Sequence, residues 1–263
     1  MTTDVLYCVA DDGSIIGYTT LGQGPHLVVV TSWATTIERQ LAPDGPAPFY
    51  NGLRSGRTVV MLDRRGVGAS RPAVEDQSRA TQIGDVQRVM DALRIEVCDF
   101  VGDNNGCYLV AAYAALHPER VRGIALWAPL VAGSDARPER MREFARLMRS
   151  DWTAACTQWA QYAAPGATPA EQIELARAFE EMTSPSFAAS YLEWEADEDV
   201  ATLLPRIAAP ALVLNSRRGG ARSMGVASLM PHARFEVVDA DPATGQLDTG
   251  DLAATIVQFF DEP

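Results

Sequence analysis

Apolar residues follow two patterns in this chain, and the two patterns alternate along the sequence. Short continuous apolar runs, such as Thr58–Leu62, are typical of strands that are buried on both faces of a parallel sheet. Other segments place apolar residues at helical spacing, as Ile83, Val86 and Met90 do within 79–93. This alternation predicts an α/β protein with a mostly parallel, doubly wound sheet and helices on both faces.

Eight strands are predicted, and the first two form a hairpin across the turn sequence Asp11-Asp12-Gly13. The predicted strands are Leu6–Val9, Ile15–Thr20, His26–Thr31, Thr58–Leu62, Val97–Val101, Gly123–Leu126, Pro210–Leu214 and Arg234–Val238. Helices are expected at Arg79–Leu93, Cys107–Leu116 and Asp251–Phe260.

A strand-free segment lies between the sixth and seventh strands. It predicts a helical cap (lid) formed by residues 131–209, with a core domain formed by residues 1–130 and 210–263. The cap helices are expected at Pro138–Ala163, Pro169–Met182, Ser184–Glu195 and Val200–Ile207. Most cap aromatics are expected to pack the cap together, with a minority, among them Trp159, Tyr191 and Trp194, facing a pocket beneath it. The acidic residues at 193–199 are expected to form a solvated end of the cap.

Composition narrows the class of partners. The chain has 263 residues, 47% of them hydrophobic, and a net charge of −12. This charge argues against nucleic acid and anionic membranes as partners, and no apolar run reaches the roughly 20 residues of a membrane span. The N-terminus shows no signal peptide, and the four scattered cysteines indicate reduced thiols in a cytoplasmic protein.

The segment Gly102-Asp103-Asn104-Asn105-Gly106 separates a strand-like run from a helix-like run. A strand, a sharp Gly-x-nucleophile-x-Gly turn and a helix form the nucleophile elbow of α/β-hydrolases. The middle residue here is Asn104, and an amide cannot attack a carbonyl group. Because Asn tolerates left-handed backbone, a purely structural role for Asn104 is an equal alternative.

The chain resembles the α/β-hydrolases over essentially its whole length. The resemblance rests on ordered motifs: the hairpin, the Asp63-x-Arg65-Gly66-x-Gly68-x-Ser70 turn, the elbow, and the segments 117–121 and 210–214. Details such as Asn215-Ser216-Arg217-Arg218-Gly219 are similar to bacterial hydrolase-like modules, some of which are fused to nucleotide cyclases or transcriptional regulators. In this family Asp63 and Arg65 are expected to tie their turn by charge-assisted hydrogen bonds.

The chain departs from the family at all three triad positions. The nucleophile position holds Asn104, the acid position falls in Arg217-Arg218-Gly219-Gly220, and the histidine position falls in Val238–Ala243. His26, His117 and His232 are expected to have structural or surface roles.

The expected site combines Asn104, Asp103 and Asp241 as catalytic residues with Ser32, Trp33, Asn105 and Trp127 around a pocket. The elbow amides would stabilise negative charge there. Asp103 has an alternative role as a buried hydrogen-bonding group. No metal site, cofactor or phosphate loop is indicated.

Two functions are therefore expected, from different classes. The first is a cofactor-independent, non-hydrolytic enzyme that assists a cyclisation, elimination, isomerisation or addition on a small hydrophobic molecule, such as a secondary metabolite. The second is a catalytically inactive protein that binds a small molecule or a partner. A hydrolase with an Asp-activated water is a further alternative, and an exposed cap helix would allow a homodimer.

Overall fold

The computed structural model describes residues 4–42, 46–72, 75–129, 137–216, 220–238 and 249–262. Its strands form one sheet of eight, in the order β1-β2-β4-β3-β5-β6-β7-β8, in which β3 to β8 are parallel and β2 is antiparallel to both neighbours. The strands are β1 (Leu6–Val9), β2 (Ile15–Gly22), β3 (His26–Val30), β4 (Thr58–Leu62), β5 (Cys98–Asp103), β6 (Val121–Trp127), β7 (Ala211–Asn215) and β8 (Ala233–Val237). The predicted fold class is confirmed.

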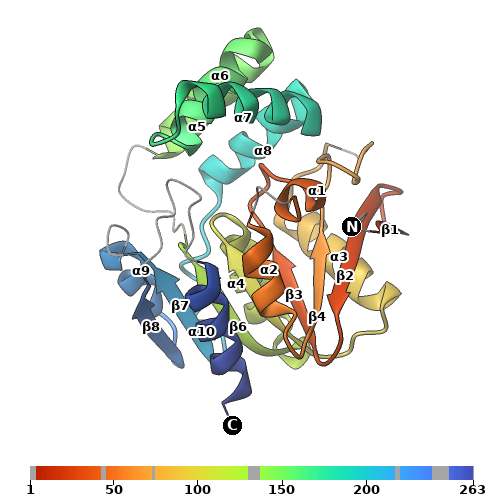
Figure 1. Ribbon diagram of the computed structural model, residues 1–263, viewed down its shortest axis with the longest axis vertical. Helices are drawn as coiled ribbons and strands as arrows, with labels where there is room; N and C mark the ends of the chain where they lie inside the picture. The colour runs from red at the N-terminus through yellow and green to blue at the C-terminus, as the bar shows by residue number, and fades with distance from the viewer. Residues whose placement is uncertain are drawn as a thin grey trace.

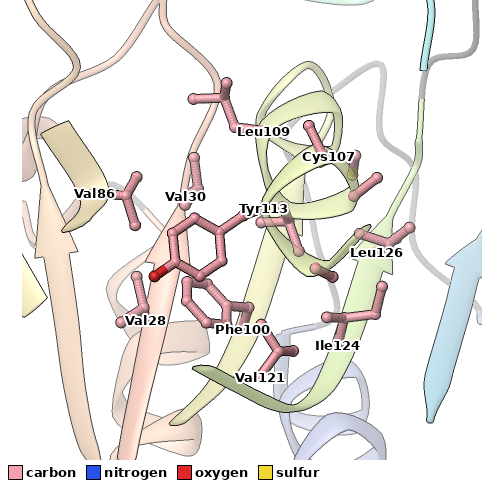
Figure 2. Packing of buried hydrophobic residues seen from close by; sticks show 14 of the residues in the cluster. Val28, Val30, Val86, Phe100, Cys107, Leu109, Tyr113, Val121, Ile124 and Leu126 are labelled. Atoms are coloured by element: carbon pink, nitrogen blue, oxygen red, sulfur yellow. The ribbon is translucent and has the colours of Figure 1, made fainter. Parts of the chain in front are cut away.

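Alternate side chains of the central strands enter two apolar layers on opposite faces of the sheet. One layer packs against α3 (Arg79–Ala92) and α4 (Gly106–Leu116), and Figure 2 shows Tyr113 of α4 over Phe100 of β5, with ring centroids 4.9 Å apart. The other layer packs against α2 (Ala47–Leu53) and α10 (Thr249–Asp261).

Four helices between β6 and β7 form a group beyond one end of the sheet, at the top of Figure 1. We name α5–α8 the cap helices. They are α5 (Arg137–Ser150), α6 (Trp152–Ala163), α7 (Pro169–Met182) and α8 (Pro185–Asp197). Their buried side chains form a separate apolar cluster that also takes in Trp33, after β3, and Val67, after β4. The cap helices therefore contact the carboxyl-terminal edge of the sheet.

Two helix predictions for this segment are wrong. The predicted helix Pro138–Ala163 is two helices, because Asp151 caps α6 by accepting a hydrogen bond from the backbone N–H of Ala154 (3.0 Å). The predicted helix Val200–Ile207 is a turn followed by the 3-10 helix Leu204–Arg206. The short helices α1 (Ile37–Gln40), α2 and α9 (Gly220–Ala227) were not predicted. No helix in the described part of the chain is long and apolar enough to cross a membrane.

Candidate functional site

The turn between β5 and α4 has the geometry of a nucleophile elbow. Asn104 adopts a left-handed backbone with φ 51°, and its N–H donates to the carbonyl oxygen of Trp127 on β6 (3.0 Å). The flanking glycines are required by packing. A Cβ at Gly106 would lie 2.1 Å from the carbonyl oxygen of Val30, and one at Gly102 would lie 2.8 Å from the Cα of Cys107. The turn therefore lifts the side chain of Asn104 at the carboxyl-terminal edge of the sheet.

Asn104 and Asp103 form a polar pair at this turn. The side-chain amide of Asn104 donates to Oδ1 of Asp103 (3.2 Å), and both residues are half-buried. Burial raises the pKa of Asp103 to about 6, although hydrogen bonds from the Asn104 amide and the Ser32 backbone act in the opposite direction. The pair thus combines a carboxyl group that titrates near neutral pH with an amide held beside it.

Trp33 and Asn105 join the loop after β3 to the elbow. The backbone N–H of Trp33 donates to Oδ1 of Asn105 (3.1 Å), and the Asn105 Nδ2 donates to Oε2 of Glu195 on α8 (3.4 Å). Glu195 also pairs with Arg137 of α5. Asn105 itself is only 4% exposed. An elbow side chain is therefore bonded to the loop on one side and to the cap on the other.

Three of the aromatic residues predicted to bind substrate pack against one another. The ring of Trp33 stacks on Tyr191 with centroids 4.5 Å apart and contacts Trp159 at 5.5 Å. All three are buried, and the indole Nε1 of Trp33 and the hydroxyl of Tyr191 have no hydrogen-bond partner among the described residues. Trp194 is half-buried beside Tyr191, with ring centroids 5.4 Å apart.

The remaining predicted site residues fall in different places. Ser32 is half-buried and its backbone N–H bonds to Asp103. Trp127 is 4% exposed and belongs to the apolar layer beneath α2 and α10, separate from the cap aromatics. Asp241 lies outside the described residues, as do Arg217 and Arg218 at the acid position.

All three histidines of the chain lie away from the elbow. His26 is the first residue of β3, His232 directly precedes β8, and His117 follows the carboxyl end of α4. The amino-terminal ends of parallel strands meet at the edge opposite the elbow. No imidazole of this chain is therefore placed beside Asn104, and the described residues contain no cluster of three potential metal ligands.

The burial of two charged residues in this region was not predicted from the sequence. Glu195 was expected in a solvated cap end, but its side chain is fully buried, and Glu198 is 7% exposed and bonded to Arg79 (2.6 Å). Glu193 and Asp197 are exposed, as predicted. A signal for Glu195 was present, because it follows Ala188, Tyr191 and Leu192 at helical spacing on the buried face of α8.

Arg64 was also missed as a residue of this region. It is 5% exposed, its guanidinium lies 5.5 Å from the ring centroid of Tyr191, and it donates to the carbonyl oxygen of Thr31 (3.4 Å) and to Gln82. Its neighbours Asp63 and Arg65 have the predicted roles. Asp63 accepts from the backbone of Ile37 and Ala69, and Arg65 pairs with Asp12 and Asp85.

Curated proteins similar to this chain include hydrolases, proline iminopeptidases and the acetyltransferase component of an acetoin cleaving system. The chain is 34% identical over 135 residues to the 2-hydroxymuconate semialdehyde hydrolase of Pseudomonas sp. (strain CF600). The matched region covers 49% of this chain and 43% of that protein. The chain is also 39% identical over 70 residues to the proline iminopeptidase of Neisseria meningitidis, covering 26% and 23% respectively. The matched region thus spans less than half the length of these relatives.

Solved structures share the fold over nearly the full length. The enol-lactonase from Burkholderia xenovorans LB400 matches with a TM-score of 0.83 and 24% identity, covering 98% of this chain and all of that one. An esterase from Exiguobacterium antarcticum matches with a TM-score of 0.82 and 16% identity over the whole of both chains. A family model described as alpha/beta hydrolase fold matches residues 25–218. Together with the elbow and the sheet order, this match shows that the chain belongs to the family with the α/β hydrolase fold.

Proposed function

We propose that this chain is a non-hydrolytic, cofactor-independent enzyme that moves a proton on a small hydrophobic molecule, with Asn104 and Asp103 as its catalytic residues. The observation that carries the proposal is the Asn104–Asp103 pair at the nucleophile turn. An amide at this position cannot form an acyl-enzyme, and no imidazole lies beside it to activate an attacking group.

The Asp103 carboxyl supplies the acid–base chemistry. A general acid or base works best when its pKa lies near the working pH, and the pKa of Asp103 is raised to about 6. The Asn104 amide donates to Asp103, so its carbonyl oxygen is turned away from that carboxyl. The backbone N–H groups of Asn105 and Gly106 lie at the start of α4 and would hold an oxygen that gains negative charge. A proton removed at one carbon and returned at another gives an isomerisation. If the proton is returned instead to a leaving hydroxyl group, water departs and the reaction is an elimination, and if it is returned to a carbonyl oxygen as the deprotonated atom bonds to the carbonyl carbon, the reaction is a cyclisation.

The cap helices supply the hydrophobic part of the site. Trp33, Trp159 and Tyr191 form the contact between these helices and the loop after β3. We assign the ligand to this contact, where separation of the cap helices from the loop would expose aromatic faces beside the elbow. In this proposal residues 131–209 act as a lid, and ligand entry requires its movement.

A second candidate is a protein that binds a small molecule without changing it. The specific observation in its favour is that the backbone N–H of Trp33 already donates to Asn105. A donor that is occupied within the protein stabilises no developing charge on a substrate unless the bond opens.

Incubation of the pure protein with a metabolite extract, followed by mass spectrometry of retained and changed compounds, separates the two candidates. The enzyme predicts loss of one compound and gain of an isomeric or dehydrated product. Asn104→Ala and Asp103→Asn should abolish this change, while the exposed Asp91→Asn at the opposite edge should not. Retention of a compound without any product would support the binding protein, and conversion by Asp103→Asn at the normal rate would exclude Asp103 as the acid or base.

A further inference from the structure

We infer that Glu195 of α8 is a positioning residue that orients Asn105, so that the cap helices control whether the backbone N–H of Trp33 is available to an oxygen atom of a ligand. The inference rests on the proposed function only for the identity of that ligand. The hydrogen-bond chain from Glu195 to Trp33 exists without it.

Donor and acceptor chemistry fixes the orientation of the Asn105 amide. A backbone N–H can only donate, so Trp33 requires the oxygen of Asn105. An ionised carboxylate can only accept, so Glu195 requires the nitrogen of Asn105. The two requirements agree, and each end of the amide has a partner that the other end cannot satisfy.

The Glu195 carboxylate is held in place by an ion pair with Arg137. The side chain of Glu195 is fully buried and pairs with the Arg137 guanidinium, which also donates to the hydroxyl of Tyr162 (2.9 Å). This arrangement joins α5, α6 and α8. The same buried charge faces Tyr108 of α4, whose pKa is raised first by burial and then by Glu195. Movement of the cap helices would therefore carry Glu195, which accepts the hydrogen bond from Asn105, away from the elbow.

Loss of the Glu195 carboxylate changes the hydrogen bonding at the elbow. Without the carboxylate, Asn105 can rotate, and the N–H of Trp33 is freed next to the N–H groups of Asn105 and Gly106. The N–H of Trp33 in the loop after β3 and the N–H groups at the start of α4 would then be available to one ligand atom. Several amide donors around one position stabilise a carbonyl or enolate oxygen. While Asn105 is bonded to both Trp33 and Glu195, a ligand oxygen must displace the Asn105 side chain to reach the N–H of Trp33. The hydrogen bond between Asn105 and Trp33 therefore inhibits ligand binding at this N–H.

Glu195→Gln tests the inference with little change in volume. Arg137 is a donor and would take the oxygen of the new amide, which leaves its nitrogen facing Asn105. Asn105 must then reverse and present its own nitrogen to Trp33, where no hydrogen bond forms. The matched control is Glu193→Gln on the same helix, because Glu193 is exposed and pairs with Arg149 on the surface.

The readout is hydrogen exchange of the Trp33 backbone amide, followed by NMR on the isotope-labelled full chain without ligand. We expect exchange to rise by about ten-fold in Glu195→Gln and in Asn105→Ala, and to stay unchanged in Glu193→Gln. Amides of Val30 and Val101 in the sheet should keep their protection. Unchanged Trp33 exchange in Glu195→Gln, or an equal rise at all these amides, would overturn the inference. No substrate enters this test, so failure of the proposed reaction leaves its outcome unaffected.

Discussion

The carbonyl oxygen of Val30 approaches Gly106 so closely that a Cβ at this glycine would lie 2.1 Å away from it. We therefore expect Gly106→Ala to separate α4 from β3 and to lower the free energy of unfolding by about 3 kcal/mol or more. The matched control is Gly84→Ala in α3, where a Cβ meets no atom within 4 Å. That variant should gain roughly 0.5–1 kcal/mol from the better helix propensity of Ala. Urea denaturation of both variants measures the difference, and equal stabilities would contradict the close approach.

The raised pKa of Asp103 predicts a pH dependence of stability. Its pKa is raised by burial from 3.8 to about 6 in the folded chain, so the folded state holds the proton more tightly than the unfolded state. The stabilisation from this group is present below about pH 4 and is lost as the pH rises through about 6. We expect the melting temperature of the wild type to fall more steeply over this range than that of Asp103→Asn. The pKa of Asp63 is also raised to about 6, so part of the slope should remain in the variant. An identical change of melting temperature with pH in the wild type and in Asp103→Asn would show that the Asp103 carboxyl is exposed to water in the folded chain.

A serine at the elbow should not create an esterase. The three histidines lie away from the elbow, so the hydroxyl of Asn104→Ser has no imidazole to activate it. We expect Asn104→Ser to hydrolyse p-nitrophenyl acetate no faster than Asn104→Ala, measured as initial rates at pH 8. A gain of about ten-fold or more over the Ala variant would show that the Asp103 carboxyl, which lies within hydrogen-bond distance of residue 104, activates the serine hydroxyl without an imidazole.

Trp33 should be the main anchor between the cap helices and the sheet. It is 1% exposed and contacts Trp159, Phe179 and Tyr191. Trp33→Ala should therefore cost about 3–5 kcal/mol in chemical denaturation. The half-buried Trp152 on α6 contacts Phe179 alone among these rings, so Trp152→Ala should cost clearly less. A larger loss in Trp152→Ala would place the anchor within the cap helices instead.

The strands were predictable because the apolar residues in their sequences match the buried positions that they occupy in the sheet. Strands β3, β4 and β7 are buried on both faces, so each contains an uninterrupted apolar run in the sequence. The short helices α2 and α9 contain too few residues to repeat a helical period, and their positions depend on packing against the sheet. The break between α5 and α6 depends on a single capping side chain, that of Asp151.

The elbow could be located from sequence, but its connections could not. The spacing of Gly102 and Gly106 reflects close backbone contacts that no side chain can replace. The bond between Asn105 and Glu195 joins positions 90 residues apart, and it depends on how α8 lies against α4. The spacing of Glu195 on α8 places it on the buried face, but no local pattern identifies Arg137 and Asn105 as the partners that its carboxylate needs there.

The place where the cap helices enter the chain has an evolutionary consequence. They follow β6 and precede β7, and these strands are hydrogen-bonded neighbours in which Trp127 pairs with Leu214. The segment thus leaves and rejoins the sheet between adjacent strands, without disturbing the order of the others. Recombination can exchange this one continuous stretch while the sheet and the elbow are inherited unchanged. Since the proposed function assigns the ligand to the contact made by the cap helices, it follows from this proposal that ligand preference can diversify faster than the fold.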